Sequence, residues 1–458
     1  MSSTDLARAY ANSHAEQFRE QLLDLIRIPS VSTEPQRAGD VRRAAEYLKA
    51  DLLAAGVERA EILPTGGHPV VYAEWLKAGP NSKTVLIYGH YDVQPAEMAD
   101  GWTSDPFVPV IRDNVIYARG ASDDKGQAFI HAKVVESYLK GAGSAPVNIK
   151  VLYEGEEEIA SVNLKAFIEA NLDLLKADVV VISDTGMIDP DQPAVCVGVR
   201  GLTYMQIDVQ AANIDLHSGQ FGGIVHNPAL ALAQIIARFH DEDNHVTVPG
   251  FYDDVVMLTP TEREALKATD IPAERLKAET GIPEAWGEAG YTLRERIGTR
   301  PTLEINGLLS GWTGEGSKTV LPAKAMAKVS CRLVANQDPQ KIYELVRDFV
   351  AEVAPAGVRV KVSLLSSGEA ASMDINDPAM RAVARAYERG WGKAPIYLRE
   401  GGSIPVVADF RKLLGVPVLL MGYGLNTDGP HGPDEHYSLA MFHRGIDTAI
   451  IFLEEISR

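Results

Sequence analysis

The sequence has little cysteine and no long apolar run. Its two cysteines, Cys196 and Cys331, stand far apart in no paired motif, so neither a disulfide framework nor a cysteine zinc site has support. No apolar stretch approaches the length of a membrane span. Residues 1–18 also lack the apolar core of a secretory signal. These absences predict a cytoplasmic protein with no membrane partner.

Positive charge is in short supply as well. The chain has 44 Lys and Arg residues against 62 Asp and Glu residues, which gives a net charge of −18 at pH 7. Such a balance argues against a nucleic-acid partner or an anionic membrane surface. Solubility alone accounts for it. A small anionic substrate remains compatible, because one local arginine can outweigh the global field.

A length of 458 residues predicts two or three domains. From residue 83 onward, strand-like apolar runs alternate with helical patterns. The runs lie at 83–90, 147–155 and 177–184, and the helical patterns at 124–141 and 161–176. This alternation predicts an α/β fold with a mostly parallel sheet and helices on both faces.

The rhythm changes near residue 200. The order from there is strand, helix, strand, strand, helix, strand, interrupted by an irregular, acidic and helix-prone stretch at about 240–300. This order is the split βαβ pattern of a ferredoxin-like domain. The α/β rhythm then resumes. We therefore predict one domain over residues 1–199 and 372–458, with a second domain, 200–371, inserted into it.

Polar side chains follow the strands of the predicted sheet. His90 ends the first strand, Glu156 to Glu158 follow the second, and Asp184 ends the third. His431 lies shortly after a strand at 417–424, and Asp123 lies on the turn that opens a helix. Because ligands of open α/β sheets gather at the carboxyl ends of the strands, we expect these residues to converge. Histidines and carboxylates together indicate a site for a divalent metal.

The number of carboxylates favours two metal ions over one. Asp123, Glu158 and Asp184 carry three negative charges, and a bound hydroxide would add a fourth. Two divalent cations make such a site neutral, and one carboxylate can bridge them. Paired metals that share a water are typical of enzymes that hydrolyse amides and phosphates.

Eight motifs, in order, carry a resemblance to a known family. They are "GHYDVQP", "RGASDDKG", "EGEEEIAS", "VVISD", "DLHSG", "SCRLV", "REGGSIP" and "DGPHGPDE". Together they resemble the M20 metallopeptidases, particularly the cytosolic nonspecific and carnosine-type dipeptidases. The resemblance implies a zinc exopeptidase-like catalytic domain and an inserted domain that mediates dimerisation or acts as a lid.

The resemblance also implies roles for individual residues around two zinc ions, which Mn²⁺ or Co²⁺ could replace. It implies His90 and Asp184 on one ion, Glu158 and His431 on the other, Asp123 between them, and a cis peptide from Asp123 to Asp124. Asp92 would orient His90, as carboxylates do for zinc-bound histidines. Glu157 would be the general base. Glu154 and Glu156 are then expected in solvent or as caps of neighbouring backbone.

For the inserted domain the resemblance implies contacts with the substrate. His217 would reach the partner subunit's site in a homodimer and stabilise the oxyanion. Arg332 would pair with the substrate's terminal carboxylate, and Gly402, Ser403 and Thr319 would add further contacts. Two plainer interpretations stay open, since His217 could bond only locally and Arg332 could form a structural ion pair. The stretch "LLSSGEAA" (364–371) lacks a histidine that animal carnosine-type enzymes carry there, which weakens any specific claim for carnosine.

The resulting hypothesis is a homodimeric two-zinc dipeptidase acting on small peptides. It would cleave the bond next to a free C-terminal carboxylate by metal-hydroxide attack, with Glu157 as general acid and base. Two alternatives keep the chemistry and change the substrate, namely an N-acyl-amino-acid deacylase or desuccinylase and a carboxypeptidase. A third is a binding protein without turnover on the same fold. Each motif alone is weaker: a lone histidine such as His90 is more often packed than a ligand, and charge runs are usually solvated.

Overall fold

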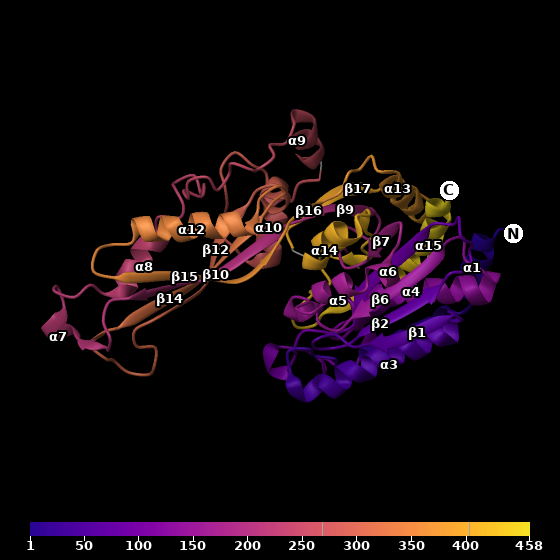
Figure 1. Cartoon of the computed structure of the whole chain (residues 1–458), viewed down its shortest axis with the longest axis horizontal. Coiled ribbons are helices and arrows are strands. Elements are labelled where there is room, and N and C mark those ends of the chain that lie inside the picture. The colour runs from indigo at the N-terminus through magenta and orange to yellow at the C-terminus, as the bar shows by residue number, and fades with distance from the viewer. Residues whose placement is uncertain (268, 403) are drawn as a thin grey trace. The chain divides into compact units, whose positions relative to one another are not determined.

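The computed structural model describes residues 1–267, 269–402 and 404–458, which form two compact units (Figure 1). The first unit contains residues 1–197, 373–398 and 409–458. The second contains residues 198–372 and 399–408. Among the described residues, no helix is long and apolar enough to cross a membrane.

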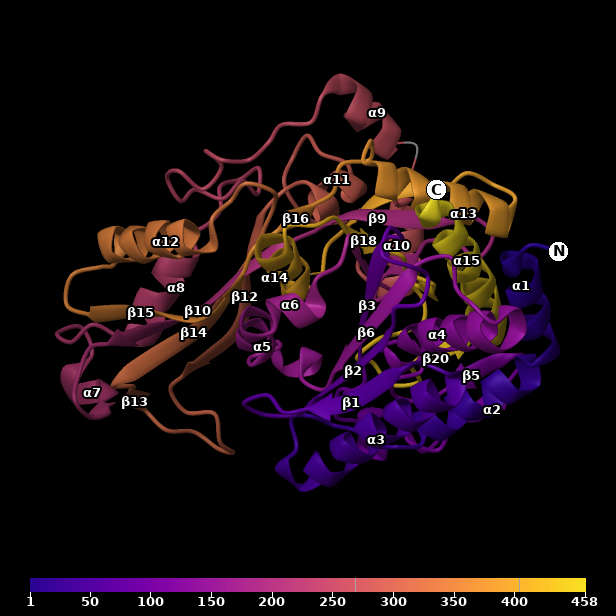
Figure 2. The same ribbon diagram turned by 45° about the vertical axis from the view of Figure 1, so that its right-hand side comes forward.

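The first unit is built on a mixed sheet in the order β1-β2-β6-β3-β7-β18-β9, with β17 also paired to β9 (Figure 2). The central strands β6, β3, β7 and β18 run parallel, whereas β1, β2 and β9 pair antiparallel. The strand bounds are β1 Arg59–Leu63, β2 Val70–Trp75, β3 Thr84–His90, β6 Asn148–Glu154, β7 Val179–Ile182, β9 Ala194–Val199, β17 Ile396–Glu400 and β18 Val418–Leu420.

Helices cover both faces of this sheet. On one face, α4 (Lys125–Glu136) lies so close to β3 that a Cβ added at Gly89 would come within 2.7 Å of the Ala128 side chain. On the other face, the edge of the Tyr88 ring contacts Phe410 of α14 (Pro405–Leu414), with ring centroids 5.4 Å apart. Because both faces are covered, the central strands are buried along almost their whole length, as is typical of parallel sheets.

The remaining elements of the first unit frame this sheet. The helices are α1 Ser3–Ser13, α2 Ala15–Ile26, α3 Ala38–Ala55, α5 Leu164–Ala170, α6 Leu172–Leu175, α13 Pro378–Trp391 and α15 Leu439–Ser457. The short strands are β4 Val110–Arg112, β5 Val115–Tyr117, β8 Gly186–Met187, β19 Gly424–Leu425 and β20 His436–Ser438.

Two predicted elements differ from the observed ones. The helix predicted at 161–176 is divided into α5 and α6 at Asn171, whose amide donates to the Phe167 carbonyl oxygen at 2.8 Å. Asparagine competes with helix formation through local bonds of this kind. The strand predicted at 417–424 is shorter, because pairing with β7 ends at Leu420. Strands β9 and β17 and helix α14 were not predicted.

The second unit is an antiparallel sheet in the order β12-β14-β10-β15. Burial alternates strictly along β10, so one face of the sheet is apolar. That face packs on two helices through residues such as Ile207, Ile235 and Val346. The bounds are β10 Gly201–Gln210, α8 Pro228–Ile236, β12 Thr302–Ser310, β14 Lys324–Leu333, α12 Pro339–Val353 and β15 Arg359–Gly368. This is the βαββαβ order of a split βαβ domain.

A long segment separates α8 from β12. Its described residues contain three short helices, α9 Pro260–Lys267, α10 Ala273–Thr280 and α11 Leu293–Gly298. Thr292 and Glu295 form a capping box at the start of α11. Smaller elements complete the unit: β11 Leu216–His217, α7 Ser218–Phe221, β13 Val320–Leu321 and β16 Ala371–Ser372.

A buried histidine in the first unit predicts acid sensitivity. His131 Nε2 lies 2.6 Å from Ser183 Oγ, and burial lowers the pKa of His131 to about 4. In the unfolded chain this pKa is about 6.5, so between these values the unfolded state binds more protons. We expect the free energy of unfolding to fall by up to about 3 kcal/mol as the pH drops through that window. Urea unfolding at a series of pH values measures it.

The variant His131→Gln removes the titrating group and should flatten the pH dependence in that window. His14→Gln, in the same unit but partly exposed, is the matched control and should keep the wild-type slope. An unchanged slope in His131→Gln would contradict the assignment.

Candidate metal centre

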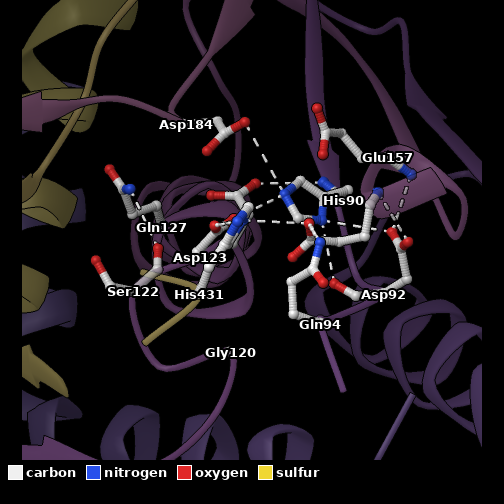
Figure 3. Close-up of polar contacts among 12 residues, drawn as sticks. His90, Asp92, Gln94, Gly120, Ser122, Asp123, Gln127, Glu157, Asp184 and His431 are labelled. Atoms are coloured by element: carbon white, nitrogen blue, oxygen red, sulfur yellow. Dashed lines mark hydrogen bonds and ion pairs between the residues drawn. The ribbon is translucent and has the colours of Figure 1, made fainter. Parts of the chain in front are cut away.

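Two groups of possible metal ligands meet at the carboxyl ends of the parallel strands (Figure 3). One consists of His90, Asp123 and Asp184, and the other of Asp123, Glu158 and His431. Within each group the ligand atoms lie within 4.8 Å of one another. All five residues belong to the first unit. The structure therefore brings together every residue for which the sequence suggested a metal-binding role.

Asp123 is the member that both groups share. Its Oδ1 lies 3.1 Å from His90 Nε2 and its Oδ2 lies 3.0 Å from His431 Nε2. Glu158 Oε2 is 3.3 Å from the same atom of His431, and Asp184 Oδ2 is 3.9 Å from His90 Nε2. Each oxygen of one carboxylate thus faces a different histidine, which is the arrangement needed to bridge two cations.

The electrostatics of these residues fit divalent cations. Burial opposes a charged His90, but hydrogen bonds to Asp123 and Asp92 raise its pKa well above the ordinary value. Hydrogen bonds to Asp123 and Glu158 raise the pKa of His431 to about 10. Burial opposes the ionised form of Asp123, yet bonds from His431 and His90 lower its pKa. The carboxylates therefore attract positive charge strongly, and bound cations would release the histidine protons. Imidazole and carboxylate donors suit Zn²⁺, Mn²⁺ or Co²⁺.

Asp92 connects one histidine to the loop after β6. His90 Nδ1 lies 3.1 Å from the Asp92 carbonyl oxygen and 3.4 Å from Asp92 Oδ1. The Asp92 carboxylate also accepts from the backbone N–H groups of Glu157 and Glu158, at 3.2 and 3.1 Å. One fully buried carboxylate therefore sets the His90 ring and the loop that carries Glu157 and Glu158.

Glu157 lies at the start of the single helical turn Glu157–Ile159. Burial and the negative charge of Asp184, Glu158 and Asp123 raise its pKa well above the usual range, against the effect of His90. A carboxyl group with a raised pKa in a carboxylate-rich site is suited to take up and return a proton near neutral pH.

The other two glutamates of the acidic run are not in solvent, which corrects part of the prediction. Glu154 is buried and accepts from Tyr88 Oη and, at 2.8 Å, from Ser161 Oγ. Burial raises its pKa to about 7. Glu156 is also buried, and it caps the backbone N–H of His68 at 2.9 Å. Of the two expected outcomes, solvent exposure is wrong for both residues, and the backbone cap is found at Glu156. Glu154 instead accepts from side-chain hydroxyl groups at the end of a buried strand.

Glu435 was missed by the sequence reasoning, although it lies within the motif that contains His431. Its buried carboxylate accepts from Arg119 Nη1 at 2.7 Å. It also accepts from the backbone N–H groups of Gly120, Ser122 and Asp123, at 3.0, 2.9 and 3.0 Å. Glu435 therefore fastens the loop of Asp123 to the loop of His431, and we call these four hydrogen bonds the Glu435 clamp. Gln94 was missed too, and its Nε2 donates to Glu158 Oε2 at 2.7 Å.

The backbone of the centre has two unusual conformations. The peptide bond between Asp123 and Asp124 is cis, as expected from the resemblance. His431 has a φ of 62°, in the left-handed region that non-glycine residues seldom adopt. A left-handed residue such as His431 is held by its surroundings, and residues of this kind cluster at functional sites.

The residues predicted to contact substrate lie in the second unit. His217 is exposed, and its Nδ1 accepts from the Gly219 N–H at 3.0 Å, a local bond. Thr319 is exposed, and its carbonyl oxygen accepts from the Ser218 N–H at 3.2 Å. Arg332 lines a cavity. The Gly402 carbonyl oxygen accepts from the Arg200 N–H at 2.9 Å. Ser403 lies outside the described residues.

Comparisons with known proteins show the family of this chain. The model of "Peptidase family M20/M25/M40" matches residues 86–455. The Cys-Gly metallodipeptidase dug1 of Schizosaccharomyces pombe is 33% identical over 96% of this chain and 96% of its own. The Beta-Ala-His dipeptidase of Homo sapiens is 30% identical over 98% of this chain and 92% of its own.

A solved structure is similar throughout. The M20 family metallo-carboxypeptidase Sso-CP2 from Sulfolobus solfataricus is 34% identical, with a TM-score of 0.86 over 96% of this chain and 99% of that one. Together these similarities confirm the predicted α/β fold class and the predicted family resemblance.

The clamp made by Glu435 predicts the effect of one substitution. Glu435→Gln would replace one carboxylate oxygen by an NH2 group, which cannot accept from the N–H groups around it, and it would leave Arg119 buried without its anion. We expect the free energy of unfolding to fall by about 3 kcal/mol, and bound metal to be lost more easily on dialysis. Urea unfolding and metal analysis by mass spectrometry measure both. The exposed ion-pair variant Glu46→Gln should change stability by no more than about 0.5 kcal/mol; equal losses in the two variants would refute the clamp.

Proposed function

The chain belongs to the peptidase family M20/M25/M40, and from this we propose that it hydrolyses dipeptides at the peptide bond next to a free C-terminal carboxylate. The observation that carries the proposal is the Asp123 carboxylate, whose oxygens lie 3.1 and 3.0 Å from His90 and His431. Relatives named Cys-Gly metallodipeptidase and Beta-Ala-His dipeptidase support dipeptides as the substrate class.

Five residues would hold two divalent cations, which we propose to be zinc. They are His90 and Asp184 for one ion, Glu158 and His431 for the other, and Asp123 for both. Such cations, when bound, polarise a carbonyl group and lower the pKa of water. Manganese or cobalt could take the same donors. Asp92 and Gln94 hold the His90 ring and the Glu158 carboxylate in place through the bonds described above.

Glu157 moves the proton. Its carboxylate takes a proton from the attacking water and then gives it to the nitrogen of the leaving amine, so that one group serves first as base and then as acid. The raised pKa of Glu157 favours its protonated state once the water has been deprotonated. Asp92 fixes the backbone N–H of Glu157 at 3.2 Å and so limits where this carboxylate can go.

The second unit would supply substrate contacts in a homodimer. Arg332 would bind the terminal carboxylate, because a guanidinium matches it with two parallel hydrogen bonds. Gly402, Ser403 and Thr319 would add contacts to the peptide. His217 would act in the site of the other subunit, where its Nε2 would donate to the oxyanion while Nδ1 accepts from Gly219. We also propose a cytoplasmic location.

A carboxypeptidase is the second candidate, because the chain is 34% identical to the metallo-carboxypeptidase Sso-CP2 over nearly its whole length. The deacylase is a third. A panel of Ala-Ala, Ala-Ala-Ala-Ala and N-acetyl-Ala separates them. We expect kcat/KM for Ala-Ala to exceed that for the other two by at least tenfold, measured by release of free alanine. Preferential cleavage of the tetrapeptide or of N-acetyl-Ala would replace the dipeptidase proposal with the matching alternative, and zinc binding without turnover would indicate a binding protein.

Subunit mixing tests Glu157 and His217 together. Each single variant, Glu157→Gln and His217→Ala, should lose at least about 100-fold in kcat, and Glu157→Gln should keep its metal content. In a mixed dimer of the two variants, one site combines an intact Glu157 with an intact His217 from the other chain. Co-expression should therefore restore roughly a quarter of wild-type activity if chains pair at random.

Activity of the mixture no higher than that of the separate variants would contradict the exchange of His217 between subunits. A Glu157→Gln variant with wild-type kcat would instead show that another group is the base. Size-exclusion chromatography of each sample confirms that dimers are present.

A further inference from the structure

A cavity of about 370 Å³ lies within the second unit, beside Arg332. Strands β12 and β14 contribute part of its lining, and the segment 286–301 that precedes β12 contributes another part. Arg200, just before β10, and residues of 240–246 complete it. Small-molecule sites commonly have volumes of about 300–1,000 Å³. The cavity is therefore large enough for an amino-acid residue.

The lining of this cavity has an excess of positive charge. It includes four arginines and two glutamates, which are Arg200, Arg296, Arg300, Arg332, Glu288 and Glu304. Arg300 is committed to Glu288, with nitrogen–oxygen distances of 2.7 and 2.6 Å. Besides this pair, the lining contains the arginines Arg200, Arg296 and Arg332 and one further glutamate, Glu304. In a protein with a net charge of −18, a local excess of this sign needs an explanation.

Two of these arginines are held by neutral groups and keep a donor without a partner. Arg200 Nε donates to the Gly401 carbonyl oxygen at 2.9 Å, and Arg296 Nη1 donates to the Trp286 carbonyl oxygen at 2.9 Å. Arg200 Nη1 and Arg296 Nε are buried and have no hydrogen-bond partner within the part of the chain that the structure describes. A buried donor without an acceptor has lost its hydrogen bonds to water and destabilises the protein. An incoming acid would remove that destabilisation.

The neighbourhood of Arg200 strengthens this conclusion. Burial, and then the charge of Arg332, lower the pKa of Arg200 to about 10, so the group stays charged at neutral pH while two like charges lie near each other. Two other arginines of 240–301 are paired with acids instead: Arg300 with Glu288, and Arg263 with Glu295 at 2.5 Å. Arg200 and Arg296 do not follow that pattern.

We propose that this cavity selects substrates whose C-terminal residue has an acidic side chain, aspartate or glutamate. Arg332 binds the α-carboxylate, and Arg200 and Arg296 bind the side-chain carboxylate. The assignment of Arg332 rests on the proposed function, whereas the second carboxylate site rests on the unsatisfied donors. Arg296 comes from the segment between α8 and β12, so that segment contributes to the preference together with Arg200.

Hydrolysis of three dipeptides tests the proposal. Ala-Glu and Ala-Gln differ in one negative charge at nearly equal size, and Ala-Ala has neither group. A charge-assisted bond of about 1.5–3 kcal/mol corresponds to roughly 10-fold to 150-fold in affinity. We therefore expect kcat/KM of the wild-type protein to be at least tenfold higher for Ala-Glu than for Ala-Gln, through KM. In Arg296→Met that preference should fall below about threefold.

Arg238→Met is the matched control, because Arg238 is an exposed arginine of the same unit and its replacement removes the same charge away from the cavity. It should keep the wild-type preference. Equal kcat/KM for Ala-Glu and Ala-Gln in the wild-type protein would overturn the inference and leave the dipeptidase proposal standing. Thermal unfolding of both variants shows whether they fold.

A binding measurement separates the two proposals if no dipeptide is cleaved. Calorimetric titration compares glutarate, which has two carboxylates, with butyrate, which has one. Tighter binding of glutarate that is lost in Arg296→Met but kept in Arg238→Met would support the cavity even though the proposed function had failed. Equal binding of the two acids, or an equal loss in both variants, would overturn it.

Discussion

The mutual repulsion of carboxylates is the constraint from which the rest of the first unit follows. Asp123, Glu158 and Asp184 approach one another within the reach of two shared cations, with Glu157 beside them. The histidines offset part of this repulsion. The loops that carry the site residues are held in place by hydrogen bonds to two other carboxylates. Asp92 and Glu435 are buried anions that bind backbone N–H groups of the loops that carry the site residues. Two further carboxylates thus position the carboxylates of the site.

The parallel sheet makes this crowding possible. Strands β3, β6 and β7 lie next to one another and end at the same edge, so a residue placed at the end of each is delivered to one point. Helix α4 begins at Lys125, two residues after Asp123, and packs against β3, where a side chain at Gly89 would meet Ala128. The close approach of this helix brings the bridging carboxylate next to His90. The geometry of the centre is therefore a property of strand order and helix packing.

The sequence predicted those parts of the structure that periodicity and topology determine. The alternation from residue 83 onward predicted the parallel strands, and strand ends predicted which acids and histidines would meet. The reasoning failed where the outcome depends on tertiary contacts. Burial of Glu154 and Glu156 depends on Tyr88, Ser161 and His68, which no local pattern links to them. The clamp of Glu435 joins residues more than 300 positions apart. The break at Asn171 depends on one side-chain amide that competed with the helix.

All five candidate ligands lie in the first unit, while the long excursion between α8 and β12 lies wholly in the second. The first part of this segment packs into the core of the second unit through Val246, Val248 and Phe251. The described residues of the short helices α9, α10 and α11 lie outside that core cluster, and these helices are fastened by polar contacts such as the capping box at Thr292. Amino-acid replacements there can therefore accumulate without disturbing the reactive groups. The substrate preference of such a chain can change while its chemistry stays the same. The segment between α8 and β12 is therefore the natural place to exchange sequence when a new selectivity is wanted.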